Sequence, residues 1–195
     1  MARSAGGASR AALDRLEVEI KEVDPTTASP VAEAMGPDGD LVEARLARGC
    51  RCFGAWLGDE LAGYGWLSTK PEWIGELELK ISPGVGEGYI WNCFTLSHQR
   101  RRGVLRALLA ALMARADQEG FTRLWIGSVG IPAEKAFAPS GFTPALVFAS
   151  EVIAGYRWLQ VRPAAGTDPA LVAAAHQAIA VPAGRFLRLS RPRRH

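Results

Sequence analysis

Residues 94–109 read FTLSHQRRRGVLRALL, and this stretch decides the fold. The run that leads into it, Tyr89 to Leu96, is apolar and aromatic and predicts a strand. After Gly103 the apolar residues recur at spacings of three and four, which predicts a helix with one buried stripe from Val104 to Glu119, ended by Gly120. A strand that passes through a short loop into a helix is the first half of a β-α-β unit.

The loop between this strand and this helix has the chemistry of an anion-binding site. The first N–H groups of a helix have no partner within the helix, and the helix dipole adds positive potential there. Arg100, Arg101 and Arg102 can hold phosphate oxygens, and Gly103 lets the backbone approach a ligand closely. We therefore expect a pyrophosphate to bind at Arg100 to Arg106. A run of arginines can also be a solvated surface or a nucleic-acid contact, but its place between a buried strand and a buried helix favours a phosphate-binding turn.

Strand and helix patterns on both sides of this segment predict a mixed sheet. Leu16 to Val23 alternates apolar and charged residues, and two apolar runs flank Gly58-Asp59-Glu60 as a hairpin. The connection from the Tyr89 strand through the long helix makes the Leu124 strand its parallel neighbour. The predicted fold class is α/β (mixed α+β), with a central, mostly antiparallel sheet, one parallel strand pair and helices on both faces. Two short helices are expected between the turn at Asp24–Thr27 and Gly49, and Thr27 or Ser29 is the expected cap of the first. The other expected elements are, in chain order, strands at Cys52–Leu57, Leu61–Leu67, Trp73–Ile81 and Leu124–Ile126, a helix at Pro132–Ala138, strands at Leu146–Ile153 and Tyr156–Val161, and a helix at Pro169–Ile179 capped by Asp168.

Length and composition fit one domain of a cytoplasmic protein. The chain has 195 residues, 48% of them apolar and 22% charged, and a formal net charge of +3. The three cysteines have no disulfide or zinc-site spacing, so we expect reduced thiols and no metal. No apolar run reaches the roughly 18 residues that span a bilayer. We expect a disordered leader at residues 1–12, one domain at 13–162, and a C-terminal helix with a basic tail at 163–195, of which Arg185 to His195 is loose.

The segment quoted above resembles the coenzyme-A segment of the GNAT family of N-acetyltransferases. The family pattern is Gln/Arg-x-x-Gly-x-Gly/Ala after its fourth strand. Arg100 and Gly103 match this pattern, whereas Leu105 stands where Gly or Ala is usual. The similarity runs from about Leu16 to Val161 and includes Phe53–Tyr64, which resembles the second and third strands of the family, and Lys135–Phe142, which resembles its late helix ending in Gly-Phe.

The resemblance implies acetyl-CoA or another acyl-CoA as co-substrate, without a metal. It also implies that the Tyr89 and Leu124 strands splay apart and that the pantetheine arm lies in the gap, bound to backbone as a further strand would be. The amide of Leu96 or of its neighbour would then stabilise the oxyanion of the reaction. The residues expected to bind the cofactor are Phe94, Thr95, Leu96, Arg100, Arg101, Arg102, Gly103, Val104, Leu105, Arg106 and Phe137.

The acid and the base of the reaction need other residues than the usual ones. Many family members carry a proton-donating Tyr at the position of Phe137 and an Asn at the position of Gly130, and this chain has neither. The catalytic candidates are Glu87 and Asn92 beside the expected cleft, with Glu78 on the preceding strand. The alternative for Glu87 is an ordinary loop carboxylate.

Three functions compete on this basis. The leading hypothesis is direct transfer of an acyl group from acyl-CoA to the amine of a small molecule or a protein, by a chain that can form a homodimer; Trp66 and Trp73 are candidates for lining the acceptor pocket. Because of Phe137, the second is a CoA-binding module of the same fold that is catalytically altered or inactive. The third is a nucleic-acid binder that uses Arg100–Arg102 and the tail Arg191–Arg194, but the chain has no nucleic-acid-binding motif. We expect neither nucleic acid nor membrane as a partner.

Overall fold

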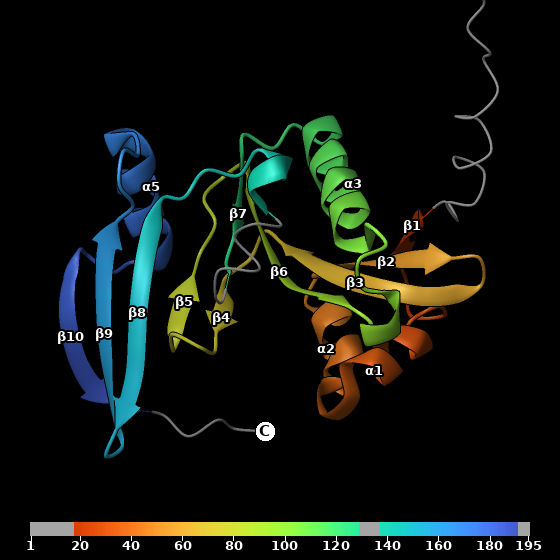
Figure 1. Ribbon diagram of the computed structural model, residues 1–195, viewed down its shortest axis with the longest axis horizontal. Coiled ribbons are helices and arrows are strands. Elements are labelled where there is room, and N and C mark those ends of the chain that lie inside the picture. The colour runs from red at the N-terminus through yellow and green to blue at the C-terminus, as the bar shows by residue number, and fades with distance from the viewer. Residues whose placement is uncertain (1–17, 129–136, 191–195) are drawn as a thin grey trace, which may run out of the picture.

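The computed structural model describes residues 18–128 and 137–190, and its centre is a five-stranded sheet (Figure 1). The strand order is β1-β2-β3-β6-β7, and every neighbouring pair is antiparallel except β6 and β7, which are parallel. The bounds are β1 Val18–Val23, β2 Arg51–Leu57, β3 Glu60–Ser68, β6 Glu87–Thr95 and β7 Arg123–Ile126. The predicted fold class is therefore confirmed, including the parallel pair on either side of the long helix.

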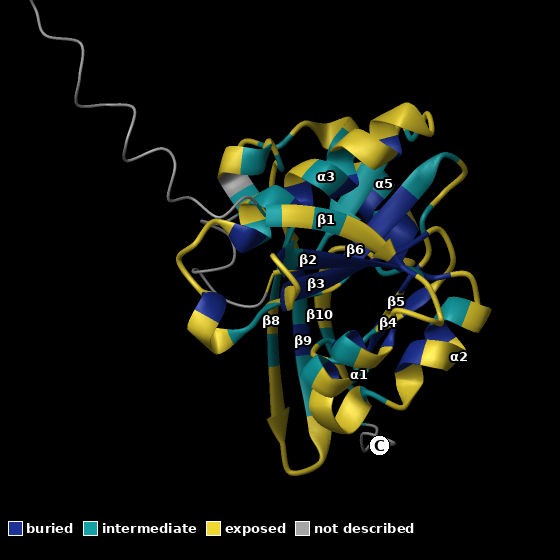
Figure 2. Cartoon of the chain, turned by 90° about the vertical axis from the view of Figure 1, so that its right-hand side faces the viewer, coloured by how far each residue is buried: buried dark blue, intermediate teal, exposed yellow. Residues whose placement is uncertain are grey.

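Helices cover both faces of this sheet (Figure 1). On one face, α3 buries the stripe of Leu108, Leu109 and Leu112 that its sequence spacing predicts. On the other face, α1 and α2 pack Val31 and Val42 against β3. Because both faces are covered, β2 and β3 are buried over nearly their whole lengths (Figure 2). The bounds are α1 Ser29–Met35, the 3-10 turn η1 Gly36–Asp38, α2 Leu41–Ala47 and α3 Val104–Gln118.

The start of α1 differs from the prediction. Its N-cap is Ala28, and no side chain caps the helix, so the prediction of a Thr27 or Ser29 cap is wrong. Thr27 instead closes a turn with Asp24. The Asp24 amide donates to Oγ1 of Thr27 at 3.0 Å, and the Thr27 amide donates to Oδ1 of Asp24 at 3.0 Å. Asp24 therefore competes for the side chain that the helix would have used.

The late strands form a second sheet in the order β10-β9-β8 and do not extend the central one. β10 pairs with β9 from Gly184 opposite Val161 to Leu189 opposite Tyr156, so the expectation of a loose tail from Arg185 onward is wrong up to Leu189. The predicted cap of α5 is confirmed, because the Ala170 amide donates to Oδ1 of Asp168 at 2.9 Å. The bounds are the 3-10 turn η3 Ala138–Ser140, β8 Leu146–Ile153, β9 Tyr156–Pro163, α5 Pro169–Ile179 and β10 Gly184–Leu189.

The run from Trp73 to Ile81 is a hairpin, where the sequence predicted one strand. It folds into β4 Glu72–Ile74 and β5 Leu79–Ile81, which pair with each other in an antiparallel sheet of two strands. Glu78, in the turn between them, has a φ of 50°. Backbone in this left-handed region cannot continue a strand, which is why the alternating pattern is interrupted.

A shared core joins the hairpin to the second sheet. Ile81 is buried together with Leu159 of β9 and Ile179 of α5, and the amide of Ser82 donates to the carbonyl of Ala178 at 2.7 Å. Residues after 163 thus pack against residues before 83, and the division of the chain at 162 stays a prediction. The leader at 1–12, the expected helix residues 132–136 and the basic residues 191–195 lie outside the described residues.

Candidate functional site

The parallel strand pair opens part of the way along β6. Pairing with β7 runs from Glu87 opposite Arg123 to Ile90 opposite Ile126, where β7 ends. β6 continues to Thr95, and among the strands of the described residues its partner there is β3 alone. At the opening, Asn92 has a φ of 46° and the register with β3 shifts, which is a β-bulge. The expected splay of these two strands is therefore present.

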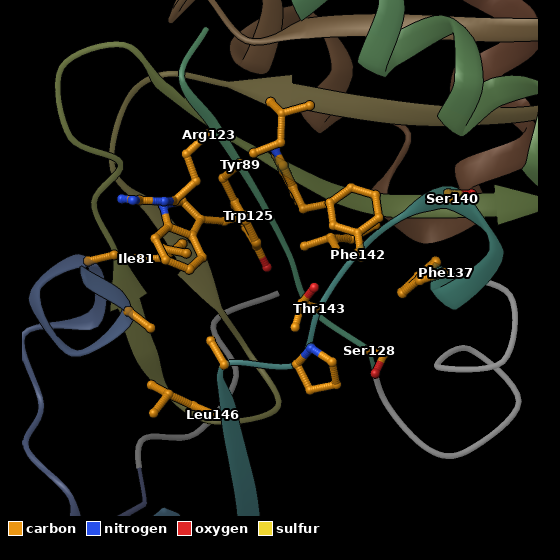
Figure 3. A pocket seen from close by; sticks show the side chains of 18 of the residues that line it. Ile81, Tyr89, Arg123, Trp125, Ser128, Phe137, Ser140, Phe142, Thr143 and Leu146 are labelled. Atoms are coloured by element: carbon orange, nitrogen blue, oxygen red, sulfur yellow. The ribbon is translucent and has the colours of Figure 1, made fainter. Parts of the chain in front are cut away.

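A groove of about 1760 Å³ lies at this opening. Its wall includes Tyr89, Trp91 and Asn92 from β6, the end of β7, and the segment around Phe137 and Phe142 (Figure 3). The rings of Phe137 and Phe142 contact each other, with centroids 6.4 Å apart. Asn92, one of the two catalytic candidates, is thus exposed at the mouth of the gap, and Phe137 contributes an apolar wall without a proton to donate.

The loop after β6 has the geometry of an anion site. It passes through the 3-10 turn η2 Ser97–Gln99 and enters α3 at Gly103, whose φ of 83° is open to glycine at little cost. No side chain caps α3, and its first turn contains no acidic residue, so no carboxylate competes with an anion there. Arg100, Arg101 and Arg102 are exposed, and Arg102 donates to Oε1 of the buried Gln99. The loop therefore combines uncapped helix amides with exposed guanidinium groups just after the end of β6.

The amide of Leu96 is not available to an oxyanion. It donates to the carbonyl of Ala62 in β3 at 3.0 Å. Because successive residues of a strand direct their N–H groups to opposite sides, the amide of Thr95 faces away from β3, toward the gap. Of the amides that the family resemblance left open, that of Leu96 is therefore engaged within the sheet and that of Thr95 is directed to the gap.

Glu87, the other catalytic candidate, lies at the closed end of the strand pair. Its carboxylate accepts hydrogen bonds from Arg123, from the indole of Trp125 at 2.8 Å and from the amide of Gly84 at 3.0 Å. Burial raises the pKa of Glu87, but these hydrogen bonds and the Arg123 charge outweigh it, so the net pKa is lowered. A carboxylate with a lowered pKa is a weak base, and this geometry favours a role in holding β6 to β7.

Glu78 is also engaged elsewhere. It forms an ion pair with Arg157 of β9 at 3.0 Å, and both side chains are nearly buried. The hydroxyl of Ser190 donates to the same carboxylate oxygen at 2.7 Å. Glu78 therefore connects the β4–β5 turn to the second sheet, and it does not line the groove as a free carboxylate.

Sequence reasoning missed Tyr89. The residue is 6% exposed, and its hydroxyl points into the groove (Figure 3). A Cβ added at Gly127 would lie 3.4 Å from the hydroxyl oxygen, so the hydroxyl reaches the end of β7 where the strands separate. Burial raises the pKa of Tyr89, which keeps the hydroxyl protonated. The signal in the sequence was its alternation with Trp91, which places both side chains on one face of β6.

Metal and membrane features are not seen in the part of the chain that the structure describes. Among residues 18–128 and 137–190, no three His, Cys, Asp or Glu side chains are grouped to hold a metal ion. No helix in those ranges is long and apolar enough to cross a bilayer.

Solved structures of other proteins have a similar fold. By fold the chain is similar to a ribosomal-protein-alanine N-acetyltransferase from Brucella melitensis biovar Abortus 2308, with a TM-score of 0.51, 20% identity, and coverage of 70% of this chain and 98% of that one. It is similar to AAC(6')-Iy in complex with the bisubstrate analog CoA-S-monomethyl-acetylneamine, with a TM-score of 0.51, 18% identity, and coverage of 70% and 99%. It is also similar to an acetyltransferase from Trypanosoma brucei, with a TM-score of 0.50, 15% identity, and coverage of 65% and 93%.

At these identities the solved structures show the fold alone, and the comparison with curated proteins found no match. The sequence itself goes further, because the profile described as "Acetyltransferase (GNAT) family" matches residues 16–142, which is most of the chain. The matched range contains both strands of the splayed pair, the arginine loop and α3. The chain belongs to the acetyltransferase (GNAT) family.

Proposed function

We propose that this chain transfers an acyl group, in the first place acetyl, from acyl-CoA to an amine of a small molecule or a protein by direct attack. One observation carries the proposal: the part of β6 beyond Ile90, which β7 does not pair with, continues through Thr95 and the arginine loop to the uncapped start of α3. Bound there, acyl-CoA would supply an activated thioester. The structure similar to this one that was solved with a CoA bisubstrate analog supports the choice of co-substrate.

Different residues around the gap bind different parts of acyl-CoA. The amides of Val104, Leu105 and Arg106, with the guanidinium groups of Arg100 to Arg102, hold the diphosphate. The backbone from Phe94 to Leu96 holds the pantetheine arm, and the amide of Thr95 donates to a carbonyl oxygen of that arm. The arm extends from there along the unpaired part of β6 toward Tyr89, where the thioester lies. Phe137 packs against the arm from the opposite wall.

The proton balance of the reaction assigns a role to Tyr89. The nitrogen of the amine forms a bond to the acyl carbon while the carbon–sulfur bond breaks, and nitrogen must lose one proton as sulfur gains one. The protonated Tyr89 hydroxyl faces the groove at the point of strand separation, so it donates to the departing sulfur and accepts the proton from nitrogen. Asn92, exposed at the bulge, orients the amine.

A catalytically inactive CoA-binding module is the second candidate. It is favoured by Phe137, which stands at the position where many family members have a proton-donating Tyr. It predicts binding of CoA without release of thiol, whereas the Tyr89 assignment predicts turnover.

Thermal unfolding and thiol release test both candidates. Acetyl-CoA at about 100 times its Kd is expected to stabilise the protein by about 2.7 kcal/mol, and a panel of amines is expected to release free thiol. The double variant Arg100→Met/Arg101→Met is expected to lose most of the thermal shift, and Arg162→Met, an exposed arginine on β9, is the matched control. No shift with millimolar acetyl-CoA or CoA would refute the proposal, and a shift without thiol release would support the inactive module. A cytoplasmic location, with thiols kept reduced, and a homodimer remain predictions.

A further inference from the structure

One charged side chain is buried under α2 with no role in the site described so far. Arg45 is 9% exposed, and its guanidinium carbon lies 4.5 Å from the ring centre of Trp91 and 5.3 Å from that of Trp66. The two indole rings are 6.0 Å apart. The three side chains thus form one compact group between α2, β3 and β6, on the face of the sheet opposite α3.

This group contains hydrogen-bond donors that lack an acceptor from the protein. Within the part of the chain that the structure describes, the guanidinium makes one hydrogen-bond contact, a weak one from Nη1 to the sulfur of Met35 at 3.8 Å. In the described ranges, no carboxylate oxygen lies within 4.0 Å of it. The indole N–H groups of Trp66 and Trp91 are buried and unpaired as well. Buried donors are almost always paired in folded proteins, and a buried charge without a partner is costly.

Stacking on the two rings stabilises the charge of the guanidinium but gives its N–H donors no hydrogen-bond acceptor. A cation above an aromatic face gains electrostatic attraction, but the N–H groups at the edge of the guanidinium and of each indole still need oxygen acceptors. Burial also lowers the pKa of Arg45, with the nearby Asp38 charge acting in the opposite direction, and this shows how poorly the charge is compensated. A negatively charged oxygen group is the complement that this arrangement lacks.

The group lies beside the proposed reaction centre. Trp91 follows Ile90, the last residue of β6 that pairs with β7, and precedes the bulge at Asn92. Its side chain also lines the groove. Trp91 therefore links the group to the groove, since its ring contacts Arg45 and its side chain forms part of the groove wall.

We propose that Arg45, Trp66 and Trp91 bind a carboxylate of the acceptor, so that the acceptor is an amine that also carries a carboxylate, such as an amino acid or a peptide end. This inference rests on the proposed function, since it names the substrate class of the same site. A carboxylate carries one negative charge and matches the fork of one guanidinium. A phosphate carries about 1.5 to 2 negative charges, and a single arginine would leave the excess buried and unpaired.

Ligand pairs that differ only in the carboxylate give the direct test. Thermal unfolding is measured in saturating CoA with glycine, β-alanine, L-phenylalanine and glycylglycine, and with the carboxamide of each. For at least one pair, wild type is expected to bind the carboxylate about 10- to 100-fold more tightly than the carboxamide, the range of a charged hydrogen-bonded contact. Arg45→Met is expected to remove this preference and to leave the shift caused by CoA alone unchanged.

A neighbouring arginine is the matched control. Arg48→Met removes a partly exposed arginine that pairs with Glu72, and the carboxylate preference is expected to remain. Trp91→Phe keeps a ring and removes one N–H donor, and it is expected to reduce the preference several-fold. It also provides a second variant if Arg45→Met does not fold.

The results separate this inference from the proposed function. If no carboxylate binds better than its carboxamide, or if the preference survives in Arg45→Met, the group is a structural ring stack or holds a buried water, and the inference fails. Thiol release from carboxamide amines at equal rates would leave the acyltransferase proposal standing and overturn only the carboxylate site. Loss of the CoA shift in wild type would instead overturn the proposed function.

Discussion

At the scale of single residues, the proposed chemistry depends on the hydroxyl of Tyr89. Tyr89→Phe removes the hydroxyl that faces the groove and keeps the buried ring. We expect kcat to fall by about 100-fold or more, the usual size of a lost proton-transfer group. The KM for acetyl-CoA and the thermal shift with CoA should stay unchanged, since Tyr89 does not contact the diphosphate loop. Tyr156→Phe, at an exposed tyrosine of β9, is the matched control, and an unchanged kcat in Tyr89→Phe would remove the assignment.

For Glu87 we expect substitution to lower the stability of the fold and to change kcat little. Glu87→Gln removes the charge that holds Arg123 and should destabilise the protein by about 1.5 to 3 kcal/mol at pH 7, with kcat changed only a few-fold. The pKa of Glu87 is lowered from 4.5, so its ionised form stabilises the fold above that pH, and the contribution disappears as the pH falls through the folded-state pKa. Denaturant unfolding at pH 7 and near pH 3 should therefore show a difference between variant and wild type that shrinks in acid. A large loss of kcat would mean that Glu87 acts as a base after all.

The residue scale also shows where the sequence stops being informative. The arginine loop could be found because its parts are adjacent, and an anion site at a helix start depends only on local backbone. The side-chain partners of Glu87, Arg123 and Trp125, lie 36 and 38 residues along the chain, so no local pattern could show that they engage its carboxylate. The same holds for Arg45, whose burial against Trp66 and Trp91 arises only when α2 packs on the sheet.

At the scale of elements, α3 provides a comparison between its own two ends. Gly103 and Gly120 flank the helix with φ values of 83° and 75°, and a Cβ would meet nothing within 4 Å at either position. Alanine at either position should therefore cost about 1 kcal/mol of stability through backbone strain. Only Gly103→Ala is expected to weaken CoA binding, because only that end carries the proposed anion site. Denaturant unfolding and CoA titration of both variants decide this, and equal CoA affinities would place the diphosphate elsewhere.

Prediction of elements succeeded where periodicity was long and failed where pairing was distant. The buried stripe of α3 repeats over several turns, so its sequence determines both its type and its buried face. β10 was missed because Arg185 and Arg188 dominate a short segment. Its inward residue Phe186 packs against the core shared with β5, and this contact cannot be seen in the local sequence. The turn that splits β4 from β5 begins at Gly75, but its left-handed residue is Glu78, a type that rarely signals a turn, so the alternating pattern hid it.

At the scale of the whole molecule, the hairpin and the second sheet decide whether the chain unfolds as one unit. The family match ends at residue 142, yet Leu79 and Ile81 share a core with Leu159 and Ile179, beyond the match. Because apolar burial joins the two parts, the domain should unfold in one transition with the second sheet included.

Substitution of Arg157 tests whether the central sheet and the second sheet unfold in one transition. Arg157 pairs with Glu78 and donates to the carbonyl of Glu76 at 2.7 Å, so it holds the β4–β5 turn against the second sheet. Arg157→Met leaves a buried carboxylate without this cation and should destabilise the whole domain by about 3 to 5 kcal/mol, still in a single transition. Arg162→Met, exposed on the same strand, should change stability by less than about 0.5 kcal/mol. Two separate transitions in Arg157→Met, measured by circular dichroism and tryptophan fluorescence, would show instead that the second sheet folds independently of the acetyltransferase core.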